Sequence, residues 1–109
     1  MNFDEYQKES KKTDLSPVVG TDYIYHVIGL SGEVGEFANK VKKVFRDDGG
    51  IMTEEKKQAI SEELGDILWY ISQVATKLDI PLDDIAQGNI KKLFSRMERG
   101  TLQGSGDNR

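Results

Sequence analysis

Apolar residues recur every three or four positions along most of the chain, which is the spacing of an amphipathic helix. No segment alternates apolar and polar residues over a useful length, so the sequence predicts no strands. A short helix is expected over residues 2–12, with Phe3 and Tyr6 on its apolar edge. Residues 13–20 contain a proline and a glycine and are expected to form a loop.

A long second helix is expected next. Thr21 or Asp22 can cap it, and the pattern continues to about Arg46, where an Asp-Asp-Gly-Gly run ends it. Its apolar positions are Tyr23, Val27, Leu30, Val34, Phe37, Ala38, Val41, Val44 and Phe45. Three glycines interrupt the helix and indicate either room for a phosphate or a neighbouring helix, or a local bend. They are Gly29, Gly32 and Gly35.

Two further helices complete the pattern. Thr53 is expected to cap the third, and its apolar stripe is Ile60, Leu64, Ile67, Leu68, Ile71, Val74, Ala75 and Leu78. The fourth is expected to begin near Pro81 and to stop at Gly100. It carries Leu82, Ile85, Ala86, Ile90, Leu93, Phe94 and Met97. The sequence therefore predicts one all-α domain over residues 1–100 and a flexible Gly-rich tail over residues 101–109.

Composition narrows the classes of function. The chain has 109 residues, of which 37% are hydrophobic, so its core is small and we expect oligomerisation to complete the fold. A formal net charge of −4 argues against a nucleic-acid backbone as partner. Cysteine is absent, which excludes disulfides and thiolate metal sites. We find no signal peptide and no apolar run of membrane length, so a cytoplasmic location without membrane contact is expected.

Four carboxylates form two pairs with the same spacing. Glu33 and Glu36 lie in the second predicted helix, and Glu63 and Asp66 lie in the third. Residues three positions apart share a helix face, and at about 100° per residue each pair lies on the same edge of its apolar face. A short linker favours an antiparallel hairpin, which brings these edges to the same side. We therefore expect the four acids to border one groove.

Charge repulsion indicates what the groove binds. Two unit charges about 5 Å apart repel by roughly 3 kcal/mol at an effective dielectric constant near 20. Several such pairs would strain a fold that is stable by only about 5–15 kcal/mol, so protonation, hydration or a bound cation must relieve them. All-oxygen ligands suit Mg²⁺ or Mn²⁺, and such a centre suggests chemistry on phosphates. The alternative, ordinary solvated acids, fits one such pair better than two matching pairs.

Two other side chains limit the alternatives. His26 is the only histidine and projects to the apolar side of its helix, which predicts a core or interface histidine. No acidic residue is followed three positions later by a histidine, so we reject a di-iron carboxylate site. Trp69 lies off the main apolar stripe, and an interface or second-core role is favoured over stacking on a base.

At the acidic residues the chain resembles the MazG-like members of the all-α nucleoside triphosphate pyrophosphohydrolases. Their motif is Glu-x-x-Glu, a spacer, and then Glu-x-x-Asp. The run Glu-Glu-Leu-Gly-Asp-Ile-Leu-Trp-Tyr at residues 62–70 is very close to the second part of that motif. The resemblance extends from about Tyr23 to Arg99. It implies a MazG-like helical bundle of four main helices, assembled as a homodimer or homotetramer.

The activity that this resemblance implies is hydrolysis of a (deoxy)nucleoside triphosphate to a monophosphate and pyrophosphate. Mg²⁺ would be held by Glu33, Glu36, Glu63 and Asp66, and the same four acids are the expected catalytic residues. Glu36 or Glu33 is the expected general base. Two alternatives stay open: phosphoribosyl-ATP pyrophosphohydrolase, which shares the fold and the acids, and a non-catalytic helical oligomerisation module, which would bind no Mg²⁺.

Five further residues are expected to bind the substrate. Related enzymes carry Asn-x-x-Lys-x-x-x-Arg on the last helix, and this chain has Asn89, Lys92 and Arg96 at that spacing. The amide could read a base edge and the two cations could neutralise phosphates, although a solvated basic face is an equal alternative. Lys40 lies within about 20° of Glu33 around its helix and is a further phosphate candidate. Tyr70 lies between Glu63 and Asp66 in angle and could touch the site.

Overall fold

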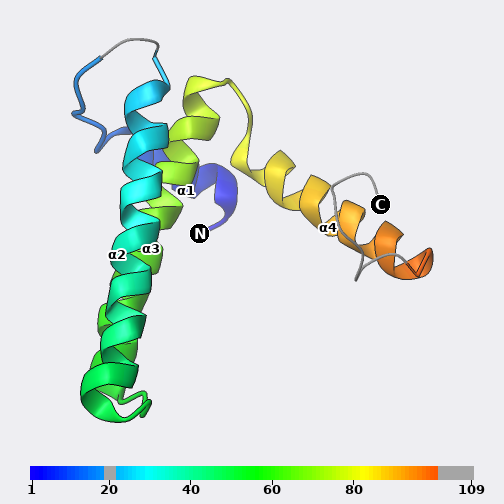
Figure 1. The fold of residues 1–109 in the computed structure, drawn as a ribbon. Helices are drawn as coiled ribbons and strands as arrows, with labels where there is room; N and C mark the ends of the chain where they lie inside the picture. Colours follow the sequence, from blue (N-terminus) through cyan, green and yellow to red (C-terminus); the bar gives the residue numbers. More distant parts are fainter. Residues whose placement is uncertain (19–21, 101–109) are drawn as a thin grey trace.

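The computed structural model describes residues 1–18 and 22–100, and this part of the chain contains helices and no strand (Figure 1). The helices are α1 (Phe3–Lys11), α2 (Ile24–Asp48), α3 (Glu54–Lys77) and α4 (Leu82–Glu98). The all-α prediction is therefore confirmed. The tail 101–109, with its expected flexibility, lies outside the described residues.

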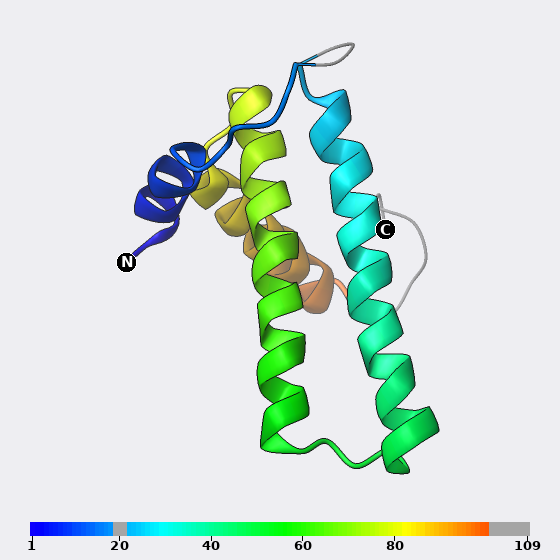
Figure 2. The ribbon, with the colours of Figure 1, turned by 90° about the vertical axis from the view of Figure 1, so that its left-hand side faces the viewer.

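A long antiparallel hairpin of α2 and α3 forms the body of the molecule, as Figure 2 shows. The turn begins at Gly49 and Gly50, whose φ angles of +62° and +80° are in the left-handed region that favours glycine. The Thr53 side chain then accepts a hydrogen bond from the Lys56 amide at 3.2 Å, which confirms the predicted cap of α3. α2 ends at Asp48 rather than at about Arg46, because the aspartates before the glycines stay helical.

The start of α2 differs from the prediction. Tyr23 precedes the first helical residue, and no side chain among the described residues caps this end. A capping Asp or Thr needs an extended backbone, whereas Tyr23 already has helical angles of φ −107° and ψ −12°. Asp22 is therefore one residue too early to cap the helix, and Thr21 lies outside the described residues.

Polar side chains join α1 to the end of α3. Gln7 donates hydrogen bonds to the Thr76 hydroxyl at 3.2 Å and to the Ile80 carbonyl at 3.0 Å. Its carbonyl oxygen accepts a hydrogen bond from the Leu82 amide at 2.7 Å, which satisfies one of the free amides at the start of α4. One side chain of α1 thus holds the connection between α3 and α4.

Helix α4 leaves the hairpin at an angle and projects away from α2 (Figure 1). It contacts α1 and α3 but not α2. Pro81 immediately precedes it, as predicted, and Gly100 follows its end with a φ of +72°. Its apolar side chains are largely uncovered: the exposed ones are Ile85, Ile90, Phe94 and Met97.

Little apolar surface is buried within one copy of the chain. The fully buried apolar residues among those described are Val44, Ala75 and Leu82. The radius of gyration is 16.8 Å, whereas a compact domain of this length has about 13 Å. One copy is thus extended, with apolar faces open on α2 and α4. No helix in the described ranges is long and apolar enough to cross a membrane.

Candidate metal centre

Three of the four predicted acids converge across the hairpin. Glu33 comes from α2, and Glu63 and Asp66 come from α3. Each offers one carboxylate oxygen, and these oxygens all lie within 4.8 Å of one another. Glu63 is buried, Glu33 is half-buried and Asp66 is exposed. The group is closed on the side of Glu63 and open to solvent on the side of Asp66.

Glu36 is not part of this three-oxygen group, although it lies one turn along α2 from Glu33. Its side chain is exposed, and its negative charge is close enough to raise the pKa of Glu33. Three of the four expected acids therefore form a compact group, and the fourth lies beside them on α2.

The acids affect one another as repulsion predicts. Partial burial raises the pKa of Glu33, and the negative charges of Asp66 and Glu63 raise it further. A carboxyl group with a raised pKa holds its proton more tightly because the charged form is disfavoured. A divalent cation near these oxygens would reverse that effect. All-oxygen ligands from two facing helices fit a hard cation such as Mg²⁺ or Mn²⁺.

Lys40 reaches the same centre from α2. Its ammonium lies 2.7 Å from Oε1 of Glu63. The hydrogen bond to Glu63 is the main reason why the pKa of Lys40 is raised. The lysine side chain is 39% exposed, so the contact is at the edge of the centre rather than beneath it.

Tyr70 packs against the backbone of α2 one turn beyond Asp66. A Cβ atom built at Gly29 would overlap the Tyr70 ring, so a glycine is required for this close approach. Of the three glycines noted in the sequence, Gly29 makes room for a neighbouring helix. A Cβ built at Gly32 or Gly35 has no atom of the described part of the chain within 4 Å. The pKa of Tyr70 is raised mainly by its burial and to a lesser extent by the neighbouring Tyr25 and Glu33.

A mostly apolar hollow of about 230 Å³ lies beside Tyr70. Its lining residues are Ile24, Tyr25, Ile28, Gly29 and Tyr70. Gly29 and Tyr70 each lie four residues from a member of the acidic group, Glu33 and Asp66 respectively. The hollow is therefore about one helical turn away from the acids.

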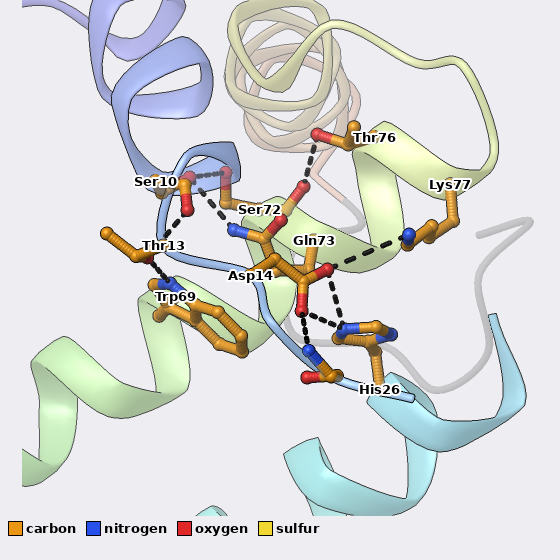
Figure 3. Close-up of polar contacts among 10 residues, drawn as sticks. Ser10, Thr13, Asp14, His26, Trp69, Ser72, Gln73, Thr76 and Lys77 are labelled. Carbon is orange, nitrogen blue, oxygen red and sulfur yellow. Dashed lines mark hydrogen bonds and ion pairs between the residues drawn. The ribbon is translucent and has the colours of Figure 1, made fainter. Parts of the chain in front are cut away.

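A second polar cluster lies where α1 and the following segment meet α2 and α3 (Figure 3). His26 is only 2% exposed and places Nε2 3.0 Å from a carboxylate oxygen of Asp14, while Lys77 lies 3.7 Å from the same oxygen. Burial alone would raise the pKa of Asp14, but hydrogen bonds from Ser16 and His26 outweigh it and lower the pKa. His26 is thus a core histidine, as predicted.

Trp69 belongs to this cluster as well. Its indole Nε1 donates a hydrogen bond to the Thr13 hydroxyl at 2.8 Å, and its ring lies edge-on to Tyr70. The favoured packing role for Trp69 therefore agrees with the structure. No motif signalled Asp14: it is an isolated acid in a predicted loop, and its charged partner Lys77 is far away in the sequence.

The predicted substrate residues of α4 are not gathered at the acids. Asn89 and Lys92 are exposed on α4, and Arg96 is 3% exposed. Because α4 does not contact α2, these side chains do not join Glu33 or Lys40 within one copy of the chain. Of the five predicted substrate residues, the structure brings Lys40 and Tyr70 to the centre.

Comparison with known proteins identifies the family of this chain. The family model described as "MazG nucleotide pyrophosphohydrolase domain" matches residues 26–101, a range that contains all four acids. The chain is 46% identical to the "Gene 37 protein" of Mycobacterium phage L5 over 114 aligned positions that cover the whole of both chains. No solved structure matches. The match over most of its length shows that this chain belongs to the MazG nucleotide pyrophosphohydrolase domain family.

Proposed function

We propose that this protein is a Mg²⁺-dependent hydrolase that converts a (deoxy)nucleoside triphosphate to its monophosphate and pyrophosphate. One observation carries the proposal: carboxylate oxygens of Glu33, Glu63 and Asp66 lie within 4.8 Å of one another in a chain of this family. The residues fit the cation because every donor is an oxygen and because three carboxylates from two facing helices converge at one place. Mn²⁺ is a possible substitute because it accepts the same ligands.

The chain supplies the ligands and a base. Glu33, Glu63 and Asp66 would hold the metal, which supplies positive charge for the phosphates and a more acidic bound water. Glu36 is exposed and outside the three-oxygen group, so it is the better placed of the two proposed bases to accept a proton from the attacking water. Water then attacks the α-phosphorus and pyrophosphate leaves.

The substrate is proposed to lie along the hairpin from Lys40 to Tyr70. Lys40 is close enough to the acids to contact the phosphates. The hollow beside Tyr70 is apolar and lined by two tyrosines, which suits the flat face of a base. This placement puts the phosphates at the acids and the nucleoside about one turn away along α2.

A second copy of the chain is proposed to complete the pocket. The apolar faces of α2 and α4 are uncovered, and exposed apolar surface of this extent indicates an interface. Asn89 and Lys92 are exposed on α4, which does not contact α2, so they would reach the substrate when α4 of one copy approaches the hairpin of another. A homodimer or homotetramer satisfies both needs, and sedimentation equilibrium distinguishes them from a monomer.

The test is a panel of NTPs and dNTPs, with phosphoribosyl-ATP included, incubated with Mg²⁺ and with EDTA. Chromatography should resolve monophosphate and pyrophosphate from diphosphate and phosphate. We expect the first pair of products, and only with the metal present. Release of diphosphate, or no hydrolysis of any compound on the panel, would contradict the proposal, and turnover of phosphoribosyl-ATP alone would redirect it.

A further inference from the structure

A cation of the chain itself is bound to one of the three clustered acids. The Lys40 ammonium lies 2.7 Å from Oε1 of Glu63, and Glu63 is the buried member of the group. Lys40 belongs to α2 and Glu63 to α3, so the pair crosses the hairpin. The positive charge therefore lies beside the buried acid, at the edge of the centre.

This ion pair and a divalent cation compete for the same carboxylate, that of Glu63. A Mg²⁺ ion binds oxygen at about 2.0–2.1 Å. If Lys40 kept its contact with Oε1 while a metal ion bound that atom, the ammonium and the metal would lie less than about 5 Å apart. Their repulsion would cancel much of the attraction that the acids provide.

Lys40 is able to move without disturbing the core. Its side chain is 39% exposed and flexible, whereas Glu63 is held in place by burial. Lys40 follows Glu36 by four positions and Glu33 by seven, so all three lie on one face of α2. An ammonium released from Glu63 stays beside the acids, on the face where phosphates would bind.

We propose that Lys40 is an exchangeable counter-ion of this centre. It neutralises Glu63 while the acids hold no divalent cation, it is displaced from Oε1 when the cation binds, and it then contacts the phosphates of the ligand. The last step depends on the function proposed above, whereas the displacement depends only on metal binding.

The test compares Lys40→Met with the wild type in a titration with Mn²⁺ alone, followed by electron paramagnetic resonance. Losing a half-exposed ion pair should make Mn²⁺ bind up to about fivefold more tightly. Lys40→Arg keeps the charge and should bind Mn²⁺ like the wild type. Lys42→Met removes an exposed lysine two residues away and controls for the change in net charge.

A second titration uses pyrophosphate in the presence of saturating Mg²⁺. Here Lys40→Met should bind about tenfold more weakly, because a charge-assisted hydrogen bond to phosphate is lost. Tighter binding of Mn²⁺ together with weaker binding of pyrophosphate in Lys40→Met is the result expected of a lysine that exchanges between Glu63 and phosphate. Unchanged pyrophosphate binding would overturn the transfer of Lys40 to phosphate.

Three outcomes of the metal titration would overturn the displacement: equal Mn²⁺ affinity in Lys40→Met and the wild type, an equal gain in Lys42→Met, or no Mn²⁺ binding by either protein. The metal titration requires no turnover. If the wild type hydrolyses nucleotides but Lys40→Met leaves Mn²⁺ affinity unchanged, the proposed function stands. The proposed role of Lys40 as a counter-ion is then wrong.

Discussion

Asp14 and Glu33 are both carboxylates at the boundary of the same helices, yet their surroundings are opposite. Asp14 lies between His26 and Lys77, and hydrogen bonds from Ser16 and His26 lower its pKa despite its burial. Partial burial and the nearby negative charges of Asp66 and Glu63 raise the pKa of Glu33. The cluster around Asp14 satisfies its charge within the chain, whereas the centre around Glu33 leaves negative charge for a ligand. The first arrangement is structural, and the second is suited to binding.

The largest expected effect is the loss of turnover when the ligand-facing acids are changed. Glu33→Gln and Asp66→Asn should stay folded and lose a hundredfold or more in pyrophosphate release, the order seen when an essential charge stabiliser is removed. Glu62→Gln alters an exposed neighbour of Glu63 and is the matched control. Full activity in both site variants would contradict a binding role for the acids around Glu33.

Asp14→Asn should instead reduce stability. It removes the negative charge that both His26 and Lys77 contact. Hydrogen bonds to a charged group contribute about 1.5–3 kcal/mol, so we expect the free energy of unfolding, measured with urea, to fall by about 2 kcal/mol. Asp22→Asn changes an exposed aspartate and should have little effect. If the two variants were equally stable, the Asp14 cluster would not hold the fold.

Alanine substitutions at Gly29 and Gly32 should change stability in opposite directions. Gly29→Ala would force the Tyr70 ring away from α2, and overpacking of this kind costs about 1–3 kcal/mol in unfolding free energy. Gly32→Ala meets no atom within 4 Å and should gain up to about 1 kcal/mol from helix propensity. A destabilising Gly32→Ala would show that a second copy covers that position.

The smallest effect is a difference in pH dependence. The raised pKa of Glu33 contributes stability at low pH, which is lost as the pH rises from the ordinary glutamate value near 4.3 through the raised value. Glu33→Gln, without metal, should therefore be more stable than the wild type at pH 7 but not at pH 3.5. The lowered pKa of Asp14 has the reverse sign: its contribution is present at pH 7 and is lost as the pH falls below about 4. Urea unfolding at several pH values measures both.

The sequence predicted most of the elements and the location of the acids. Helical spacing, Thr53 as a cap and the shared edge of the acidic pairs are local properties, so they can be read from one segment at a time. Contacts between distant segments could not be read in that way. The partners of Asp14 lie on α2 and α3, and the ion pair of Lys40 with Glu63 depends on the register between two helices.

The direction in which α4 leaves the hairpin could not be predicted from the sequence either. Its apolar face was correctly placed on a helix, but the pattern does not say whether that face packs on the same copy. Likewise, helical angles placed Glu33 and Glu36 on one edge, whereas only the structure shows that Glu36 is outside the three-oxygen group.

Gln7 gives the short first helix an importance that its size does not suggest. Through three hydrogen bonds this one amide holds the connection from which α4 leaves the rest of the chain. If α4 joins one copy to another, the geometry of the whole assembly depends on a residue outside the acidic group. A change at Gln7 would then alter catalysis by redirecting a neighbour's helix, with the local chemistry of the centre intact.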